Sequence, residues 1–198
     1  MESLLGITAK DCVIIAADST TAHSISVMKH DQNKMFKLGK NMAMVISGEA
    51  GDPSIFGDFM QKNLALYSIK NQYSLGPHGA AHYIRRTLAE SIRSRRPYGV
   101  HLLLAGCSED EGSCLYYMDY LGSLAKVPFG AHGYGAYFSL SIMDRLHKKD
   151  CDREEAISIV RECIKEIQHR LIINLPSFKI YAVTKDSVEE IEDLSMQE

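Results

Sequence analysis

The sequence contains no tryptophan and only five cysteines, and no two of these cysteines form a C-x-x-C pair. An odd number of widely spaced cysteines argues against a disulfide framework and favours reduced thiols, so we expect a protein of the cytoplasm and nucleus. A zinc site built from Cys151 and His147 is disfavoured, because no second ligand pair follows at the usual spacing. We therefore predict no metal and no cofactor.

The chain also lacks an excess of one charge and any long apolar run. Its 22 Lys and Arg residues stand against 25 Asp and Glu residues, a net charge of −3, which argues against a dedicated nucleic-acid binder. The longest apolar runs, Cys12–Ala17 and Leu102–Gly106, fall far short of the ~20 residues that a membrane-spanning helix needs. The start, Met1–Gly6, has no basic region of the kind that opens a signal peptide. We predict neither a membrane nor a nucleic-acid partner.

The length of 198 residues, with 45% hydrophobic and 24% charged residues, is typical of one globular domain. A chain of this size buries roughly 70% of the surface that it exposes when unfolded, so it needs no disulfides or metal for stability. No low-complexity linker and no internal repeat divides it. We therefore predict a single domain over residues 1–198.

Short apolar segments at the beginning predict an antiparallel meander, because turn residues such as Lys10-Asp11 separate them closely. The predicted strands are Leu4–Thr8, Cys12–Ala17, Ile25–Met28, Met35–Leu38 and Met42–Ser47. Two helices are predicted next. The first begins with Asp52 as N-cap and Pro53 in its first turn, and the second ends before Pro97. Their apolar stripes are Phe56, Met60, Leu64 and Tyr67 in the first and Ile84, Leu88 and Ile92 in the second.

The second half repeats this order of strands followed by helices. The predicted elements are strands at Val100–Ala105, Cys114–Asp119 and Ser123–Val127, two helices of which the clearer spans Asp152–His169, and a hairpin of Phe178–Thr184 with Val188–Ile191. Asp152 with Glu155 three residues later is typical of a capping box. Two antiparallel sheets with a helix pair on each outer face would bury every apolar stripe. The predicted fold class is therefore α+β, a four-layer αββα sandwich.

Two motifs have ordinary structural interpretations. Arg85, Arg86, Arg93, Arg95 and Arg96 form the densest charge cluster. The default interpretation is a solvated helix face, and the alternative is a surface that pairs with acidic residues of another protein. The glycine-rich Gly130–Gly135 matches neither a G-x-x-x-x-G-K-[ST] loop nor a G-x-G-x-x-G fingerprint. We expect these glycines to let a helix start pack close to the sheets.

Asp18 and Lys34 are candidates for a catalytic ion pair, since a lysine beside a carboxylate can act as a base or stabilise charge. On spacing alone, an aspartate followed by Ser19-Thr20 is ordinary turn chemistry. There is no G-x-S-x-G elbow, and the eight histidines form no recognisable triad pattern.

Five motifs in order along the chain resemble those of the β-type subunits of the proteasome core particle. They are CVIIAADS at Cys12–Ser19, SGEAGD at Ser47–Asp52, SIRSRRPY at Ser91–Tyr98, LYYMDYLG at Leu115–Gly122 and GAHGYGA at Gly130–Ala136. The resemblance implies the fold of N-terminal-nucleophile hydrolases. It also implies assembly with other α- and β-type subunits in stacked seven-membered rings, with a regulatory particle as an indirect partner. These rings enclose a chamber for ubiquitin-dependent protein degradation.

Active members of that family use an N-terminal threonine whose own α-amine acts as the base. The resemblance places Glu2 at the position of this threonine, so the nucleophile is missing. Asp18, Lys34 and Gly48 match the supporting aspartate, the lysine and the glycine of the oxyanion hole. Three further positions depart from the family pattern: Tyr134 replaces a serine, and Leu171 and Asn174 replace an aspartate and a second serine. We therefore expect no catalytic residues and a non-catalytic, structural subunit.

Two competing functions remain open from the sequence. One is a threonine protease that uses an internal Thr20 or Thr21 after cleavage, although such a cut would remove the first strand. The other is a free-standing amidohydrolase of the same fold with Ser3 as nucleophile, which would require loss of Met1 and Glu2. We expect instead that the mature chain begins at Met1.

Overall fold

The computed structural model describes residues 2–23, 26–49 and 51–195. Within these ranges the chain combines helices with antiparallel sheets, which confirms the α+β class. One five-stranded sheet has the order β10-β1-β2-β11-β12, with β10 at Phe129–Gly133, β1 at Ser3–Thr8, β2 at Val13–Asp18, β11 at Ser177–Val183 and β12 at Val188–Ser195. The other has the order β5-β6-β7-β8-β9, with β5 at Met35–Lys37, β6 at Met42–Gly48, β7 at Val100–Ser108, β8 at Gly112–Met118 and β9 at Leu124–Val127. A short sheet pairs β3 (Thr21–His23) with β4 (Ser26–Lys29).

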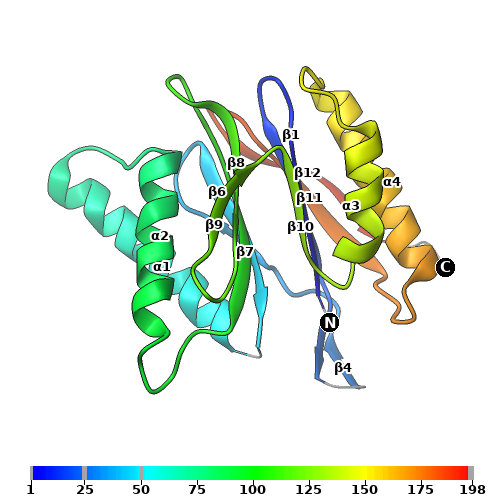
Figure 1. Cartoon of the computed structure of the whole chain (residues 1–198), viewed down its shortest axis with the longest axis horizontal. Helices are drawn as coiled ribbons and strands as arrows, with labels where there is room; N and C mark the ends of the chain where they lie inside the picture. Colours follow the sequence, from blue (N-terminus) through cyan, green and yellow to red (C-terminus); the bar gives the residue numbers. More distant parts are fainter. Residues whose placement is uncertain (1, 24–25, 50, 196–198) are drawn as a thin grey trace.

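The two large sheets face each other and each carries a helix pair on its other face (Figure 1). A cluster that includes Leu4 and Ile15 from one sheet and Val45 and Leu103 from the other fills the space between the sheets. Helices α1 (Asp52–Asn71) and α2 (Pro77–Ser91) cover the β5–β9 sheet, and α3 (Ala136–Leu146) and α4 (Arg153–Arg170) cover the first sheet. Because both faces of each sheet are covered, central strands are continuous apolar runs and do not alternate with polar residues.

The predicted helix stripes are largely confirmed. Phe56, Met60 and Leu64 of α1 and Ile84 and Leu88 of α2 are buried against the β5–β9 sheet. The capping box at the start of α4 is also present. Its Asp152 side chain accepts a hydrogen bond from the backbone N–H of Glu155 at 2.8 Å.

Two details of the helix predictions are wrong. Gly51, not Asp52, is the N-cap of α1, and Asp52 is the first helical residue. The Asp52 carboxylate instead accepts a hydrogen bond from the N–H of Gly99, so it ties the helix start to the segment before β7. Ile92 follows the last residue of α2 and is exposed, because the chain turns toward the Arg-rich loop there.

The strand predictions missed two features. The Gly130–Gly135 segment begins as strand β10, which pairs with β1 in the register Ser3 opposite Gly133. A periodicity argument could not find it, because glycines interrupt the run. The strand predicted at Ile25–Met28 is observed as β4, whose partner β3 was not predicted, and Ile25 lies outside the described residues.

The structure also describes the helices with respect to membrane spanning and the state of the cysteines. In the described ranges, no helix is both long enough and apolar enough to cross a bilayer. All five cysteines are buried as free thiols.

Candidate functional site

The candidate site lies at the start of β1. The end of β2, from the same sheet, and the end of β6, from the other large sheet, lie beside it. Asp18 is the last residue of β2, Lys34 immediately precedes β5, and Gly48 is the last residue of β6. The three residues that the resemblance singled out are therefore brought to one place by three separate elements. Glu2, which immediately precedes β1, joins them there.

Asp18 is the most deeply buried charge of the site, with a carboxylate that has no exposed surface. Its Oδ1 accepts a hydrogen bond from the N–H of Ser3 at 2.7 Å, and its Oδ2 accepts from the N–H of Thr20 at 3.1 Å. Burial raises the pKa of Asp18, while the nearby Lys34 ammonium and the Ser3 N–H act in the opposite direction. The side chain thus fixes the start of β1 against the end of β2.

Lys34 donates two hydrogen bonds and forms a further ion pair. Its Nζ donates to Asp18 Oδ2 at 2.8 Å and to the carbonyl oxygen of Thr20 at 2.8 Å, and it lies 3.1 Å from Glu2 Oε1. An ammonium group carries donors and no acceptor, and here all three of its partners are oxygen atoms, two of them from carboxylates. The side chain is only 4% exposed. Lys34 is therefore held in one position by partners on three sides.

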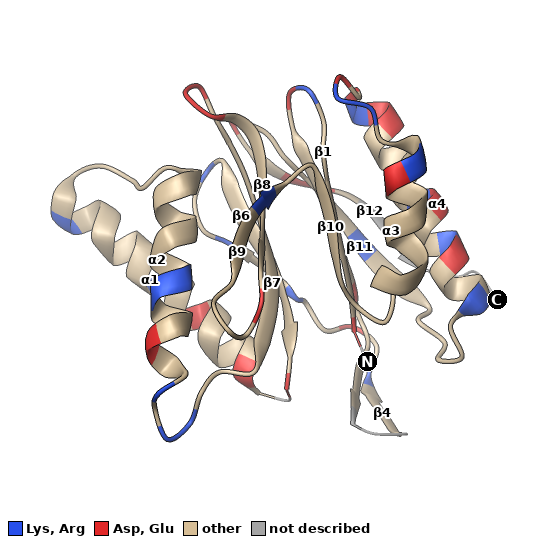
Figure 2. Ribbon diagram, viewed as in Figure 1, with Lys and Arg blue, Asp and Glu red and all other residues tan. Residues whose placement is uncertain are grey.

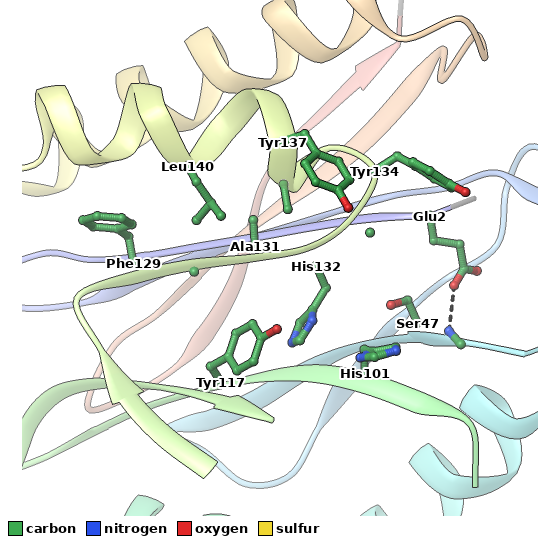
Figure 3. Close-up of a pocket in the computed structure, with 14 residues that line it drawn as sticks. Glu2, Ser47, His101, Tyr117, Phe129, Ala131, His132, Tyr134, Tyr137 and Leu140 are labelled. Atoms are coloured by element: carbon green, nitrogen blue, oxygen red, sulfur yellow. Dashed lines mark hydrogen bonds between the residues drawn. The ribbon is translucent and has the colours of Figure 1, made fainter. Parts of the chain in front are cut away.

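The Glu2 carboxylate bridges two donors, one with each oxygen. Oε1 lies next to Lys34 Nζ, and Oε2 accepts a hydrogen bond from the Gly48 N–H at 2.9 Å (Figure 3). The sequence placed Glu2 at the nucleophile position but did not predict these contacts. The local order of residues carries no signal for them, because the two donors come from positions 34 and 48.

Two glycines are required by close contacts at the site. A Cβ at Gly48 would clash with the carbonyl oxygen of Gly99, so only glycine allows this N–H to face Glu2. A Cβ at Gly135 would lie 2.6 Å from Ser3 Oγ and 2.9 Å from Ile167 Cδ1. Since Gly135 is the N-cap of α3, this confirms the interpretation that glycine lets a helix start pack closely.

Glu2 and Gly48 separate two cavities. The larger, of about 780 Å³, has mainly aromatic and apolar walls from β7, β8, β10 and the start of α3 (Figure 3). Its lining includes His101, Tyr117, Phe129, His132, Tyr134, Tyr137 and Leu140. The smaller, of about 130 Å³, is lined by Lys34, Phe36 and Ile46 as well as by Glu2 and Gly48.

An aromatic cluster forms one wall of the larger cavity. His132 stacks on Tyr117 with ring centroids 4.0 Å apart, and its Nε2 lies 3.1 Å from the carbonyl oxygen of Leu102. Burial, together with the neighbouring His101, lowers the pKa of His132 to about 4, so this ring is uncharged at neutral pH. Nδ1 of His101 is buried and has no hydrogen-bond partner among the residues that the structure describes.

The other predicted site residues are distributed unevenly. Tyr134 lies on the rim of the larger cavity, where Figure 3 shows it near Glu2, and it is exposed. Leu171 packs against the core beneath α3 and α4, and Asn174 is exposed. The structure thus places Tyr134, but not this later pair, among the residues that line the Glu2 cavities.

The hydroxyl groups of the competing hypotheses are buried. Ser3 has no exposed surface and its Oγ accepts a hydrogen bond from the Gly135 N–H. Thr20 is 1% exposed, and its backbone is held by Asp18 and Lys34. Oγ1 of Thr21 is buried as well, although this residue lines the smaller cavity, and none of the three residues lines the larger one.

The Arg-rich segment, residues 85–96, lies on α2 and the loop that follows it (Figure 2), and none of its arginines lines the two cavities beside Glu2. Arg85 donates from Nε to the Gly122 carbonyl, and Arg86 pairs with Glu90. Arg93, Arg95 and Arg96 are exposed, as expected for a solvated face.

Cys151 and His147 also have ordinary structural environments. Nε2 of His147 lies 3.1 Å from the Thr8 carbonyl oxygen, and Cys151 is buried beside α4. In the part of the chain that the structure describes, no group of three or more His, Cys, Asp or Glu residues is arranged to hold a metal ion.

Comparison with known proteins gives a consistent family assignment. A family model described as "Proteasome subunit" matches residues 2–183. The chain is 43% identical over 193 residues to a probable proteasome subunit beta type-4 of Neurospora crassa, covering 97% of this chain and 95% of that protein.

Two further relatives extend this similarity across kingdoms. Proteasome subunit beta type-2-B of Arabidopsis thaliana is 42% identical over 190 residues, which covers 96% of this chain and 95% of the relative. Proteasome subunit beta type-4 of Saccharomyces cerevisiae is 35% identical over 198 residues, with full coverage of both chains.

Proposed function

This chain belongs to the proteasome subunit family, and we propose that it is a non-catalytic, structural subunit of the proteasome core β ring. The observation that carries this proposal is the position of Glu2. Its carboxylate contacts both Lys34 and Gly48, the two groups that would serve a nucleophile and an oxyanion in an active relative. The site is therefore occupied by a side chain that has no hydroxyl.

A carboxylate in this position cannot replace an N-terminal threonine. The family's chemistry needs a hydroxyl for attack and a free α-amine as base, and an α-amine has an ordinary pKa of about 7.7–8.0 that leaves a neutral fraction at cytosolic pH. While Met1 is retained, as this proposal expects, the nitrogen of Glu2 is a peptide nitrogen and not a free amine. Asp18, Lys34 and Gly48 retain the electrostatic frame of the site without its nucleophile.

The proposal includes an architecture and a setting. The chain would adopt the four-layer αββα sandwich of N-terminal-nucleophile hydrolases as a single domain, at the fourth position of a seven-membered β ring. It would contact other α- and β-type subunits and, indirectly, a regulatory particle. Active neighbours in the cytoplasm and nucleus would then carry out the ubiquitin-dependent degradation of proteins.

Assembly tests the structural part of this proposal. Expressed alone, the chain should sediment as a monomer, a small oligomer or an aggregate, because a ring of unlike subunits needs contacts that are complementary to other chains. Co-expressed with partner subunits, it should enter a large particle at a fixed place, as native mass spectrometry would show. A well-formed ring made of this chain alone would contradict the proposal.

Reactivity tests the non-catalytic part. The isolated protein should neither hydrolyse fluorogenic peptides nor react with epoxyketones, which trap a hydroxyl together with an adjacent free amine. Glu2→Thr, freed at its N-terminus by an engineered cleavage, should recover little activity, because Tyr134 does not supply the hydroxyl of the family's serine. Robust turnover by that variant would show that Asp18, Lys34 and Gly48 are sufficient for catalysis.

A further inference from the structure

The contacts of Glu2 define an anion site that this chain fills with its own residue. The Lys34 ammonium lies 3.1 Å from one oxygen of the carboxylate, and the Gly48 N–H donates to the other at 2.9 Å. Two donors held by separate elements and aimed at one carboxylate form a preorganised receptor for an anion. Both donors would remain if the Glu2 side chain were removed.

The receptor is fixed much more firmly than its occupant. Lys34 is 4% exposed and is held by Asp18 and by the Thr20 carbonyl, independently of Glu2. Gly48 ends β6, where its backbone pairs with Val100 of β7, and a side chain at this position would clash with the Gly99 carbonyl oxygen. Glu2 precedes the first strand and its side chain is 19% exposed. The occupant is thus the part of this arrangement that can be altered without rebuilding the rest.

The native site holds one negative charge at this point, that of the Glu2 carboxylate. Asp18 neutralises Lys34 through a 2.8 Å ion pair, so the frame without Glu2 carries no net charge. A guest carboxylate would restore the charge that Glu2 supplies in the native chain. The larger cavity begins at the same carboxylate and is lined by Phe129, Leu140 and Tyr137, so an apolar group attached to the guest has space beside it.

We propose that Lys34 and Gly48 form a carboxylate-binding site, that Glu2 is its internal occupant, and that shortening Glu2 opens the site to external carboxylates that carry an apolar group. In the native chain Glu2 then excludes peptide carbonyl groups and peptide C-termini from the Gly48 N–H. This deepens the proposed non-catalytic role, because the same residue that lacks a nucleophile also blocks the oxyanion position.

The test uses the full chain with Glu2→Ala and two probes of nearly equal shape, phenylacetate and phenylacetamide. Only the first is an anion. Phenylacetate should shift the Gly48 amide resonance of Glu2→Ala in a saturable manner and, at about tenfold its Kd, raise Tm by about 3 °C. Phenylacetamide should do neither. The native chain and Glu2→Gln, whose carboxamide fills the same space, should not respond to phenylacetate.

Each outcome decides the proposal. The proposal is wrong if Glu2→Ala responds equally to phenylacetate and phenylacetamide, or to neither. It is also wrong if the native chain responds to phenylacetate as strongly as Glu2→Ala does. If Glu2→Ala does not fold unaided, the two probes are added during refolding. Recovery of folded chain with phenylacetate alone supports the site, and recovery with both probes or with neither contradicts it. Assembly is not measured, so the inference can fail while the proposed ring subunit stands.

Discussion

The molecule carries two clusters of charged side chains, one buried and paired and the other largely exposed to solvent. The Glu2–Asp18–Lys34 cluster is held between strands of the two large sheets, and Lys34 pairs there with two carboxylates and one carbonyl oxygen. The Arg-rich segment at residues 85–96 lies on the surface of α2 and its following loop (Figure 2). Its Arg93, Arg95 and Arg96 are exposed, and among the described residues no carboxylate pairs with them.

The difference between the clusters follows from the solvent around them. An exposed ion pair gains little, because water and salt screen it and the long side chains lose freedom. A buried charge has lost its hydration, so removal of its partner leaves an uncompensated ion in a medium of low dielectric constant. The few charges near Glu2 should therefore matter far more to folding than the many arginines.

The largest effect is expected for Lys34→Met. This change leaves the buried Asp18 carboxylate without its cation and should lower the free energy of unfolding by about 3–5 kcal/mol. Lys62→Met is the matched control, because Lys62 pairs with Asp58 on the exposed face of α1 and such pairs contribute only about 0.3–0.5 kcal/mol. Urea denaturation of both variants measures the difference. Losses of similar size would remove the distinction between the two clusters.

A second, smaller effect is expected for the pH dependence of stability. Burial lowers the pKa of His132 to about 4 in the folded chain, against about 6.5 in an unfolded one. As the pH falls, the unfolded state therefore takes up a proton before the folded state does. The free energy of unfolding should be unaffected by this histidine above pH 6.5 and should fall by roughly 2–3 kcal/mol as the pH is lowered toward 4.

The histidine responsible can be identified by substitution. His132→Gln should flatten the change in unfolding free energy between pH 6.5 and 4.5, measured by urea denaturation at each pH. His82→Gln, at an exposed position of α2, should leave it unchanged. An unaltered slope in His132→Gln would show that the proton is bound elsewhere.

The smallest effect is expected for the combined change Arg93→Ala, Arg95→Ala and Arg96→Ala. Exposed side chains without a partner contribute little, so the free energy of unfolding should stay within about 0.5 kcal/mol of the parent at both low and moderate salt. A loss above about 1 kcal/mol that disappears at high salt would reveal a carboxylate partner in the folded chain. The comparison between the clusters would then need revision.

Much of the fold could be predicted from the sequence, because helix stripes and capping residues are local signals. Each of these features spans only a few turns of one helix. The α1 and α2 stripes are largely confirmed, except that Ile92 is exposed, and the α4 capping box is confirmed. Where prediction failed, the local pattern did not contain the deciding contacts. Gly51 is the N-cap of α1 and Asp52 bonds instead to the distant Gly99, and Gly130–Gly133 is a strand because β1 pairs with it.

The candidate site was predictable only in part. The identities of Asp18, Lys34 and Gly48, and the absence of a threonine at Glu2, are properties of the sequence and of its family resemblance. That Glu2 itself occupies the Lys34 and Gly48 donors was decided by the tertiary structure, since only the pairing of β1 with β2 and the packing of the two sheets bring positions 2, 34 and 48 within hydrogen-bond distance. Residue types determine which chemistry is available, and burial with distance decides whether those groups meet and how strongly they interact.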